Sequence, residues 1–299
     1  MAKGKGKGLK NSLNTLLQVK QKADIEKEKR AKLSKKTKTT QGSENSKVTR
    51  PKILPPFPFT LNDRILCVGE GNFSFSHALV KVLQTGYHLV ATCYDSEQVV
   101  TEKYPDASDH INQIRQRDGT VLYNIDGTRL DKTRALKHRR FTHIIFNFPH
   151  VGMGIKDQDR NVRRNQELLL GFFQSALPLL TDPEFYSDDN QPGEIHVVTK
   201  THRPYHLWQV RQLAQASGKL VCQSTTRFYP ELFPGYEHRR TLGFQEGLSV
   251  GDNEEIMKSP PKLYVFVKGN AGEVAANQAA KKRKRKPTKS SSDSSDSDD

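Results

Sequence analysis

Residues 64–76 read Arg-Ile-Leu-Cys-Val-Gly-Glu-Gly-Asn-Phe-Ser-Phe-Ser, and this stretch decides the fold. Its first five residues form a run of strand length, and a helical pattern begins directly after the two glycines. Gly69 and Gly71 permit a tight turn and a close approach of the backbone to a ligand. A strand that turns so sharply into a helix is typical of loops that bind nucleotide-like cofactors, because the helix N-terminus offers free N–H groups. The alternative is a tight turn without a ligand.

Beyond residue 62, apolar runs of strand length alternate with amphipathic runs of helix length, which predicts βαβ units and a mostly parallel sheet. We expect seven strands, at residues 64–68, 89–94, 120–125, 142–146, 194–199, 220–227 and 262–267. Five helices are expected at residues 73–85, 96–103, 107–117, 161–180 and 205–217. The sequence therefore predicts an α/β fold with a doubly wound, Rossmann-like sheet of seven strands in a single domain.

The net charge of +15 is concentrated at the two ends of the chain. Residues 1–52 hold 16 Lys and Arg against four Asp and Glu, and residues 271–299 hold seven against five. Residues 53–270 are close to neutral, with 25 against 24. We therefore expect a disordered basic arm over residues 1–52, one domain over residues 53–270 and a disordered tail over residues 271–299.

The basic arm at residues 1–52 should supply most of the sequence-independent affinity for nucleic acid. Deleting the arm should lower the salt dependence of RNA binding, because fewer Lys and Arg then release counterions. Fluorescence anisotropy at a series of salt concentrations measures this slope for the full and the shortened chain. Equal slopes would place that affinity in the central domain instead.

The chain carries one targeting signal and few cysteines. Residues 281–286 read Lys-Lys-Arg-Lys-Arg-Lys, which predicts a nuclear import signal with the import machinery as a partner, or else a solvated charge run. The three cysteines lie far apart within apolar runs, so we expect buried thiols, a reducing compartment, no structural zinc site and no metal. No apolar run approaches the ~20 residues that span a bilayer, so no membrane partner is expected. We expect a monomer.

Acidic residues follow the second and third strands. Asp95 comes about 24 residues after Gly71, where this fold places an acid that holds a ribose hydroxyl pair. Asp126 and Gly127 follow the third strand, in a position to meet an adenine amino group. Each acid could instead cap the helix that follows. Because parallel strands end at one edge of the sheet, these residues are expected to lie together with the glycine loop.

The fourth strand ends in Asn147-Phe148-Pro149-His150, which separates the classes of cofactor. The tetrapeptide resembles the Asn/Asp-Pro-Pro-aromatic motif of methyltransferases that modify a planar nitrogen. Its oxygens can orient the nitrogen, and its aromatic ring can stack on a base. A dinucleotide-binding loop would have a third glycine where Ser74 stands, and a P-loop would have Lys followed by Ser or Thr. A nicotinamide oxidoreductase is therefore disfavoured.

Four features together resemble the eukaryotic 25S rRNA (uridine-N3)-methyltransferase family: the octapeptide at residues 69–76, Asp95, the tetrapeptide at residues 147–150, and Pro-Gly-Tyr-Glu-His-Arg-Arg-Thr at residues 234–241. The resemblance covers about residues 60–268, and the octapeptide is its most distinctive mark. It implies a class I methyltransferase fold, S-adenosylmethionine as cofactor, and methylation of a uracil in the rRNA of the pre-ribosomal large subunit, in the nucleolus. A non-catalytic pre-rRNA-binding assembly factor with this fold is the alternative.

The resemblance assigns roles to residues and leaves some of them open. Cys67 stands where an acid commonly precedes the first glycine, so Glu70 could take over that role or be a solvent-facing loop charge. Phe148 is expected to stack on uracil, Asn147 to hold its edge and the Pro149 carbonyl to accept a hydrogen bond. His150 is the candidate general base, or a loop residue while the proton leaves to water. The cofactor is expected to contact Gly69, Glu70, Gly71, Asn72, Phe73, Ser74, Asp95, Asp126 and Gly127.

The connection between the last two strands, residues 228–261, is far longer than a hairpin needs. It interleaves aromatic rings with arginines, a combination that suits base stacking and phosphate contact. The expected RNA-binding residues are Tyr236, His238, Arg239, Arg240 and, after the fifth strand, Lys200. The alternatives are a lid over the core and, for Lys200, an ordinary solvated helix start.

Overall fold

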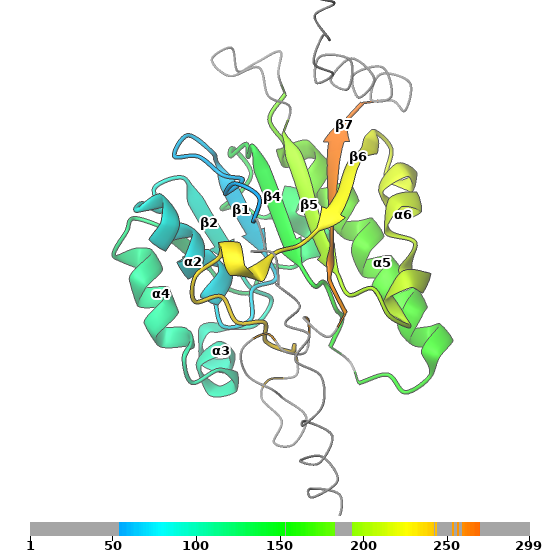
Figure 1. The fold of residues 1–299 in the computed structure, drawn as a ribbon, viewed down its shortest axis with the longest axis horizontal. Helices are drawn as coiled ribbons and strands as arrows, with labels where there is room; N and C mark the ends of the chain where they lie inside the picture. Colours follow the sequence, from blue (N-terminus) through cyan, green and yellow to red (C-terminus); the bar gives the residue numbers. More distant parts are fainter. Residues whose placement is uncertain are drawn as a thin grey trace, which may run out of the picture. The chain divides into compact units, whose positions relative to one another are not determined.

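A computed structural model describes residues 54–152, 154–182, 193–241, 243, 253, 256 and 259–269. The predicted arm at residues 1–52 and the predicted tail at residues 271–299, with its import signal, lie outside the described residues. Residues 54–269 hold the sheet and the helices that cover it (Figure 1).

Seven strands form one sheet in the order β3-β2-β1-β4-β5-β7-β6, which confirms the doubly wound α/β fold. β1, β2, β3, β4 and β5 are parallel, and β7 lies antiparallel between β5 and β6. Their bounds are β1 Ile65–Val68, β2 Leu89–Thr92, β3 Thr120–Leu122, β4 His143–Asn147, β5 Glu194–Thr199, β6 Leu220–Arg227 and β7 Lys262–Lys268. The parallel strands therefore end together at one edge of the sheet, called here the carboxyl edge.

Helices cover both faces of the sheet, with α2 and α4 on one side and α5 and α6 on the other (Figure 1). All four residues of β1 are buried, because Ile65 and Cys67 pack in one hydrophobic cluster while Leu66 and Val68 pack in the other. The bounds are α2 Ser74–Leu83, α3 Glu97–Lys103, α4 Ala107–Arg115, α5 Gln158–Ala176, α6 Val210–Ala216 and the short 3₁₀ helices η1 Gly127–Lys132, η2 Leu177–Leu179, η3 Tyr205–Trp208 and η4 Pro230–Leu232.

The structure corrects three of the expected element bounds. The helix expected at residues 205–217 is divided into η3 and α6, because Gln209 between them has a left-handed φ of 53°. The helix expected at residues 161–180 begins earlier, at an Asp157 cap, and gives way to η2 near Pro178, which lacks an N–H. β3 ends at Leu122 rather than at residue 125, shortly before Asn124 with its φ of 57°. None of the helices in these residues is long and apolar enough to cross a membrane.

The cysteines are free thiols, as expected. Cys67 and Cys93 are buried, whereas Cys222 is half-buried. The expectation of three buried thiols is therefore wrong for Cys222, because it lies on β6 at the end of the sheet, where no further strand covers it.

Candidate functional site

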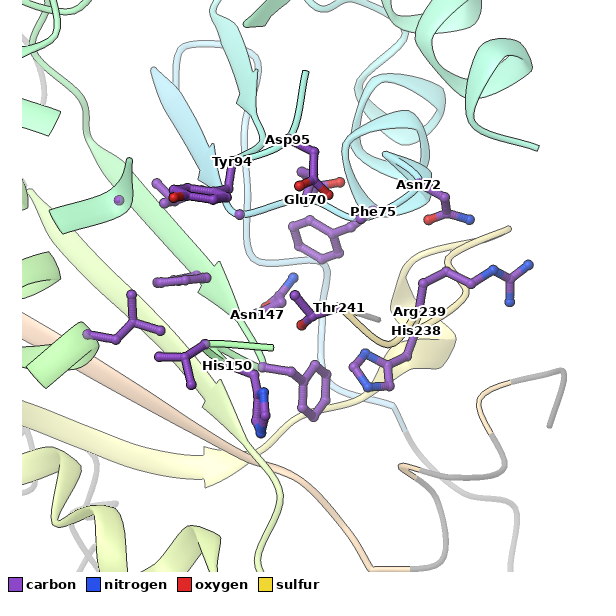
Figure 2. A pocket seen from close by; sticks show the side chains of 18 of the residues that line it. Glu70, Asn72, Phe75, Tyr94, Asp95, Asn147, His150, His238, Arg239 and Thr241 are labelled. Atoms are coloured by element: carbon purple, nitrogen blue, oxygen red, sulfur yellow. The ribbon is translucent and has the colours of Figure 1, made fainter. Parts of the chain in front are cut away.

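A cavity of about 780 Å³ lies where the parallel strands end (Figure 2). It brings together the ends of β1, β2, β3 and β4 with residues from the long connection after β6. The predicted site residues on its wall are Gly69, Glu70, Gly71, Asn72, Ser74, Asp95, Asp126, Gly127, Asn147, Phe148, His150, Tyr236, His238 and Arg239. The predicted residues outside the cavity wall are Phe73, Pro149, Lys200 and Arg240.

The loop between β1 and α2 forms one wall of the cavity and requires its first glycine. Gly69 has a φ of 68°, and a Cβ there would lie 2.5 Å from Cε2 of Phe146. Phe73 also has a left-handed φ, of 64°, and its fully buried ring packs against Tyr123. The Phe73 side chain therefore belongs to the core, which corrects the expectation that it contacts a cofactor.

The side chains of this loop cap α2 themselves. The Asn72 Oδ1 accepts a hydrogen bond from the Ser74 N–H at 3.2 Å, and the Glu70 carboxylate accepts one from the Ser76 N–H at 3.4 Å. The expectation that the start of this helix leaves its N–H groups to a ligand is therefore wrong for Ser74 and Ser76. The loop glycines and the neighbouring acids remain as groups that face the cavity.

Glu70 is partly buried, so the alternative of a solvent-facing loop charge does not hold. Burial raises the pKa of its carboxyl to about 7, although the hydrogen bond from the Ser76 N–H acts in the opposite direction. The nearby thiols of Cys67 and Cys93 and the phenol of Tyr236 all have pKa values raised by burial and by the charge of Glu70. Glu70 is therefore the group of this loop that titrates near neutral pH.

The raised pKa of Glu70 predicts a pH-dependent stability. In the unfolded chain the carboxyl ionises near pH 4.5, whereas in the folded chain it keeps its proton to about pH 7. The folded state therefore binds more protons at this carboxyl over this window, and the contribution of Glu70 to the free energy of unfolding should fall as pH rises from 4.5 to 7, by at most about 3 kcal/mol. Urea denaturation at several pH values measures this fall. The Glu70→Gln variant should lose it, and an unchanged slope in that variant would contradict the assignment.

The acids after β2 and β3 have different partners. Asp95 accepts a hydrogen bond from the Lys103 ammonium at 2.7 Å, while Ser96 rather than Asp95 caps α3. One oxygen of Asp126 accepts from the N–H of Thr128 at 2.8 Å and caps η1. The capping alternative therefore applies to Asp126 alone. Both carboxyls nevertheless line the cavity.

Asn147 ends β4 with an unsatisfied side chain. Its Oδ1 and Nδ2 are both inaccessible to solvent and have no hydrogen-bond partner among the described residues. An unpaired buried polar group costs about 1–3 kcal/mol, so it is a sign of a missing partner. The following residue, Phe148, has a left-handed φ of 50° while its N–H donates to the Val198 carbonyl at 2.8 Å. Backbone strain of this kind is concentrated at functional sites.

His150 lies on the cavity wall with one ring nitrogen already engaged. Its Nδ1 accepts a hydrogen bond from the Gly152 N–H at 2.9 Å. Burial, with a contribution from the nearby Lys200 charge, lowers the pKa of His150 below its usual value and favours the neutral ring. A neutral ring that accepts at Nδ1 carries its proton on Nε2. His150 in this arrangement is a donor, which argues against its expected role as general base.

Residues 228–241, called here the cap segment, are bound to α2 and α4 across the cavity. The Ser74 hydroxyl donates to the Glu237 carbonyl at 3.0 Å and accepts from its N–H at 3.1 Å. The Tyr104 hydroxyl donates to the Arg240 carbonyl at 2.8 Å. Asp106 accepts from the Arg239 guanidinium at 2.9 Å and from the Asn72 amide at 2.8 Å. One carboxylate thus joins the glycine loop to the cap segment.

Three of the predicted RNA-binding side chains have structural partners. The Tyr236 ring is buried against Phe75, with the ring centroids 5.3 Å apart. Arg239 forms ion pairs with Asp106 and Glu237. Lys200 is buried, and its ammonium lies 5.6 Å from the centroid of the Tyr205 ring. Tyr236 and Lys200 are thus buried, whereas Arg239 is partly exposed on the cavity wall, and the RNA-binding role of these residues stays a prediction.

His238 fits the expectation better. Its ring centroid lies 4.4 Å from that of Phe148, and both rings line the cavity. Figure 2 shows the His238 ring directed toward the centre of the site, with the Arg239 side chain turned to the other side. The two rings form an aromatic pair beside the unsatisfied amide of Asn147.

Two tyrosines on the cavity wall, Tyr94 and Tyr104, were not predicted from the sequence. Tyr94, whose ring is 73% exposed, directly precedes Asp95, so an aromatic residue next to a predicted site acid was the signal that the sequence offered. Tyr104 lies after α3 and gives no comparable signal, since only the folded chain brings its hydroxyl to the cap segment.

Comparison with known proteins assigns the chain to a family. Residues 66–240 match the BMT5-like family, described as rRNA (uridine-N3-)-methyltransferase. The 25S rRNA (uridine(2634)-N(3))-methyltransferase of Saccharomyces cerevisiae is 28% identical over 334 aligned positions, which cover 94% of this chain and 96% of the yeast protein. The heavy metal-associated isoprenylated plant protein 41 of Arabidopsis thaliana is 34% identical over 186 residues. This match spans 62% of this chain but only 34% of the plant protein. The chain belongs to the BMT5-like rRNA (uridine-N3-)-methyltransferase family.

Proposed function

We propose that this chain methylates N3 of a uridine in large-subunit rRNA, with S-adenosylmethionine as the methyl donor. The observation that carries the proposal is the unsatisfied amide of Asn147, buried on the wall of the cavity at the carboxyl edge. Loss of the N3 proton spreads negative charge onto the two carbonyl oxygens of uracil. An Nδ2 donor without another partner is suited to stabilise that charge.

The cavity suits S-adenosylmethionine in size and chemistry. Its volume of about 780 Å³ lies within the usual range for small-molecule sites. Gly69 allows a close approach of the backbone, and Asp95 and Asp126 offer carboxylates for the ribose hydroxyls and the adenine amino group. When bound, the cofactor supplies an electrophilic methyl group on a sulfonium. Glu70 follows Gly69 in the loop between β1 and α2, and its carboxyl keeps its proton to about pH 7.

The uracil must leave its base pair, because N3 lies inside a paired helix. The Phe148 ring beside Asn147 offers a stacking surface, and the ring of His238 lies next to it. Stacking on an aromatic side chain contributes about 1–3 kcal/mol per base and offsets part of the cost of unstacking. The substrate is accordingly a single-stranded or flipped uridine of the pre-ribosomal large subunit, and the site of action is the nucleolus, reached by nuclear import.

A pair of substitutions tests the role of His150. Because Nδ1 is engaged with Gly152, we expect His150 to act as a hydrogen-bond donor through Nε2 while the uracil proton leaves to water. His150→Gln keeps a donor near that position, so it should retain more of the single-turnover rate than His150→Ala. Rapid-quench measurements from pH 6 to 9 compare the two variants with the parent chain. Suppose instead that both variants lose the single-turnover rate equally, and that the rate of neither variant falls any longer toward low pH. That result would show that His150 is the general base.

The function is tested by mass spectrometry of rRNA nucleosides. Cells that lack the protein should lose 3-methyluridine from large-subunit rRNA, and the parent gene should restore it. The Asn147→Ala variant should not restore it. Calorimetry with S-adenosylmethionine and its demethylated product excludes the alternative of a non-catalytic assembly factor if both bind, and supports that alternative if neither does.

A further inference from the structure

Three metal-ligating side chains converge at the amino edge of the sheet, the end of the strands opposite the cavity. His143 is the first residue of β4 and pairs in register with Glu194, the first residue of β5, while His196 lies two residues further on the same face of β5. The Nε2 of His143 lies 3.8 Å from the Glu194 carboxylate, and the Nε2 of His196 lies 2.7 Å from it. The three ligand atoms all lie within 4.8 Å of one another.

The other ring nitrogen of His143 has a second set of partners. Its Nδ1 lies 3.4 Å from the Asp63 carboxylate and 3.0 Å from the Thr142 hydroxyl. The contacts at Nδ1 orient the His143 ring so that Nε2 faces the Glu194 carboxylate. A carboxylate behind a ligating histidine is also the usual second partner of metal-bound imidazole.

We propose that this cluster is a binding site for a divalent transition ion, with Zn²⁺ as the best fit, held by His143 Nε2, Glu194 and His196 Nε2. Ligands of a tetrahedral zinc at about 2.0–2.1 Å lie roughly 3.4 Å apart. The two ring nitrogens lie 3.8 and 2.7 Å from the Glu194 carboxylate, each within about 1 Å of this value. Two imidazoles and one carboxylate suit zinc and disfavour Mg²⁺ and Ca²⁺, which prefer oxygen ligands.

The surroundings suit a structural ion. The side chains of His143, Glu194 and His196 are 14%, 26% and 7% exposed, so an ion bound here would be mostly shielded from solvent. The ion could enter past Glu194, which is the most exposed of the three. The Phe59 ring covers the site, with its centroid 5.1 Å from His143 and 5.8 Å from His196. An ion here would tie β4, β5 and the residues before β1 together. Cysteine spacing predicted no zinc site, but histidine and carboxylate ligands on two neighbouring strands leave no such spacing signal in the sequence.

Calorimetric titration of the untagged, chelator-stripped full chain with Zn²⁺ tests the proposal. We expect saturable binding at this site and a higher Tm, with no comparable effect of Mg²⁺. Asp63→Asn retains all three ligands but should weaken Zn²⁺ binding by about 10- to 100-fold. His143→Gln removes a ligand and should weaken it more. The matched control is His110→Gln in the other histidine pair, where the Nδ1 atoms of His77 and His110 are 2.8 Å apart; this variant should bind as the parent does.

A second measurement needs no variant and so does not depend on whether a substitution folds. Co²⁺ added to the parent chain should give the visible absorption of a four-coordinate nitrogen and oxygen site, without thiolate bands, and Zn²⁺ should remove it. The proposal is overturned if the parent chain binds neither ion. It is also overturned if His143→Gln and Asp63→Asn bind Zn²⁺ as tightly as the parent, or if nitrogen NMR shows His143 doubly protonated in the presence of Zn²⁺.

Discussion

Replacing Asn147 with alanine should remove most of the methyltransferase activity and leave the fold as stable as before, or more stable. Most buried asparagines behave in the opposite way, because their hydrogen bonds hold the fold together. The amide of Asn147 has no partner among the described residues, so its removal relieves a desolvation cost and creates no new unpaired group. The bound uracil, by contrast, loses the amide that would stabilise its negative charge. Single-turnover rates should fall on the order of 100-fold or more, as expected when 3 kcal/mol or more of transition-state stabilisation is lost.

A matched substitution at Asn165 separates the effect on activity from the effect on stability. Asn165 is also buried, but its Oδ1 accepts from the Val151 N–H at 3.0 Å and its Nδ2 donates to the Asn161 carbonyl at 2.9 Å. Asn165→Ala should therefore lower the free energy of unfolding by about 1–3 kcal/mol. Urea denaturation measures both variants. If Asn147→Ala proves as destabilising as Asn165→Ala, the amide of Asn147 has a structural role and its assignment to the substrate fails.

Replacing Gly69 with alanine should damage both the fold and the cofactor site. The left-handed φ of 68° costs an L-residue about 1–2 kcal/mol. The added Cβ, 2.5 Å from Cε2 of Phe146, forces a shift of a core ring or of the loop and adds about 1–3 kcal/mol. We expect a loss of about 2–5 kcal/mol of stability in urea denaturation. S-adenosylmethionine binding, measured by calorimetry below the unfolding transition, should be lost.

Gly154 provides the control for backbone strain. Its φ of 59° is close to that of Gly69, but nothing lies within 4 Å of an added Cβ. Gly154→Ala should therefore cost only the backbone term of about 1–2 kcal/mol and should leave cofactor binding intact. Equal losses in the two variants would show that the contact with Phe146 is unimportant.

The strands could be predicted from the sequence because a parallel strand that is buried on both faces reads as a continuous apolar run. β1 shows this plainly, since each of its residues is buried. The place of β7 between β5 and β6 could not be predicted, because periodicity reports a strand and not its neighbours. The break at Gln209 was missed for a similar reason: no Gly or Pro marks it, and packing around the buried Trp208 and Val210 decides the local backbone.

The candidate site was predicted where a strand end fixes the position of a side chain, and missed where distant segments meet. Asp95, Asp126 and Asn147 line one cavity because parallel strands end at one edge. The pairing of Arg239 with Asp106 could not be foreseen, since the two residues lie 133 positions apart in the chain. An arginine in a basic, aromatic segment suggests RNA, yet its charge is already balanced here by two acids.

The carboxylate of Asp106 connects the two sides of the cavity. It accepts hydrogen bonds from Asn72 in the glycine loop and from Arg239 in the cap segment, so neither segment can move without changing the other's partner. If the methyl donor binds at the loop and RNA at the cap segment, as proposed, the two binding events are thermodynamically linked through this carboxylate. Whatever factor the methyl donor imposes on the affinity for RNA, RNA must impose in return on the affinity for the methyl donor.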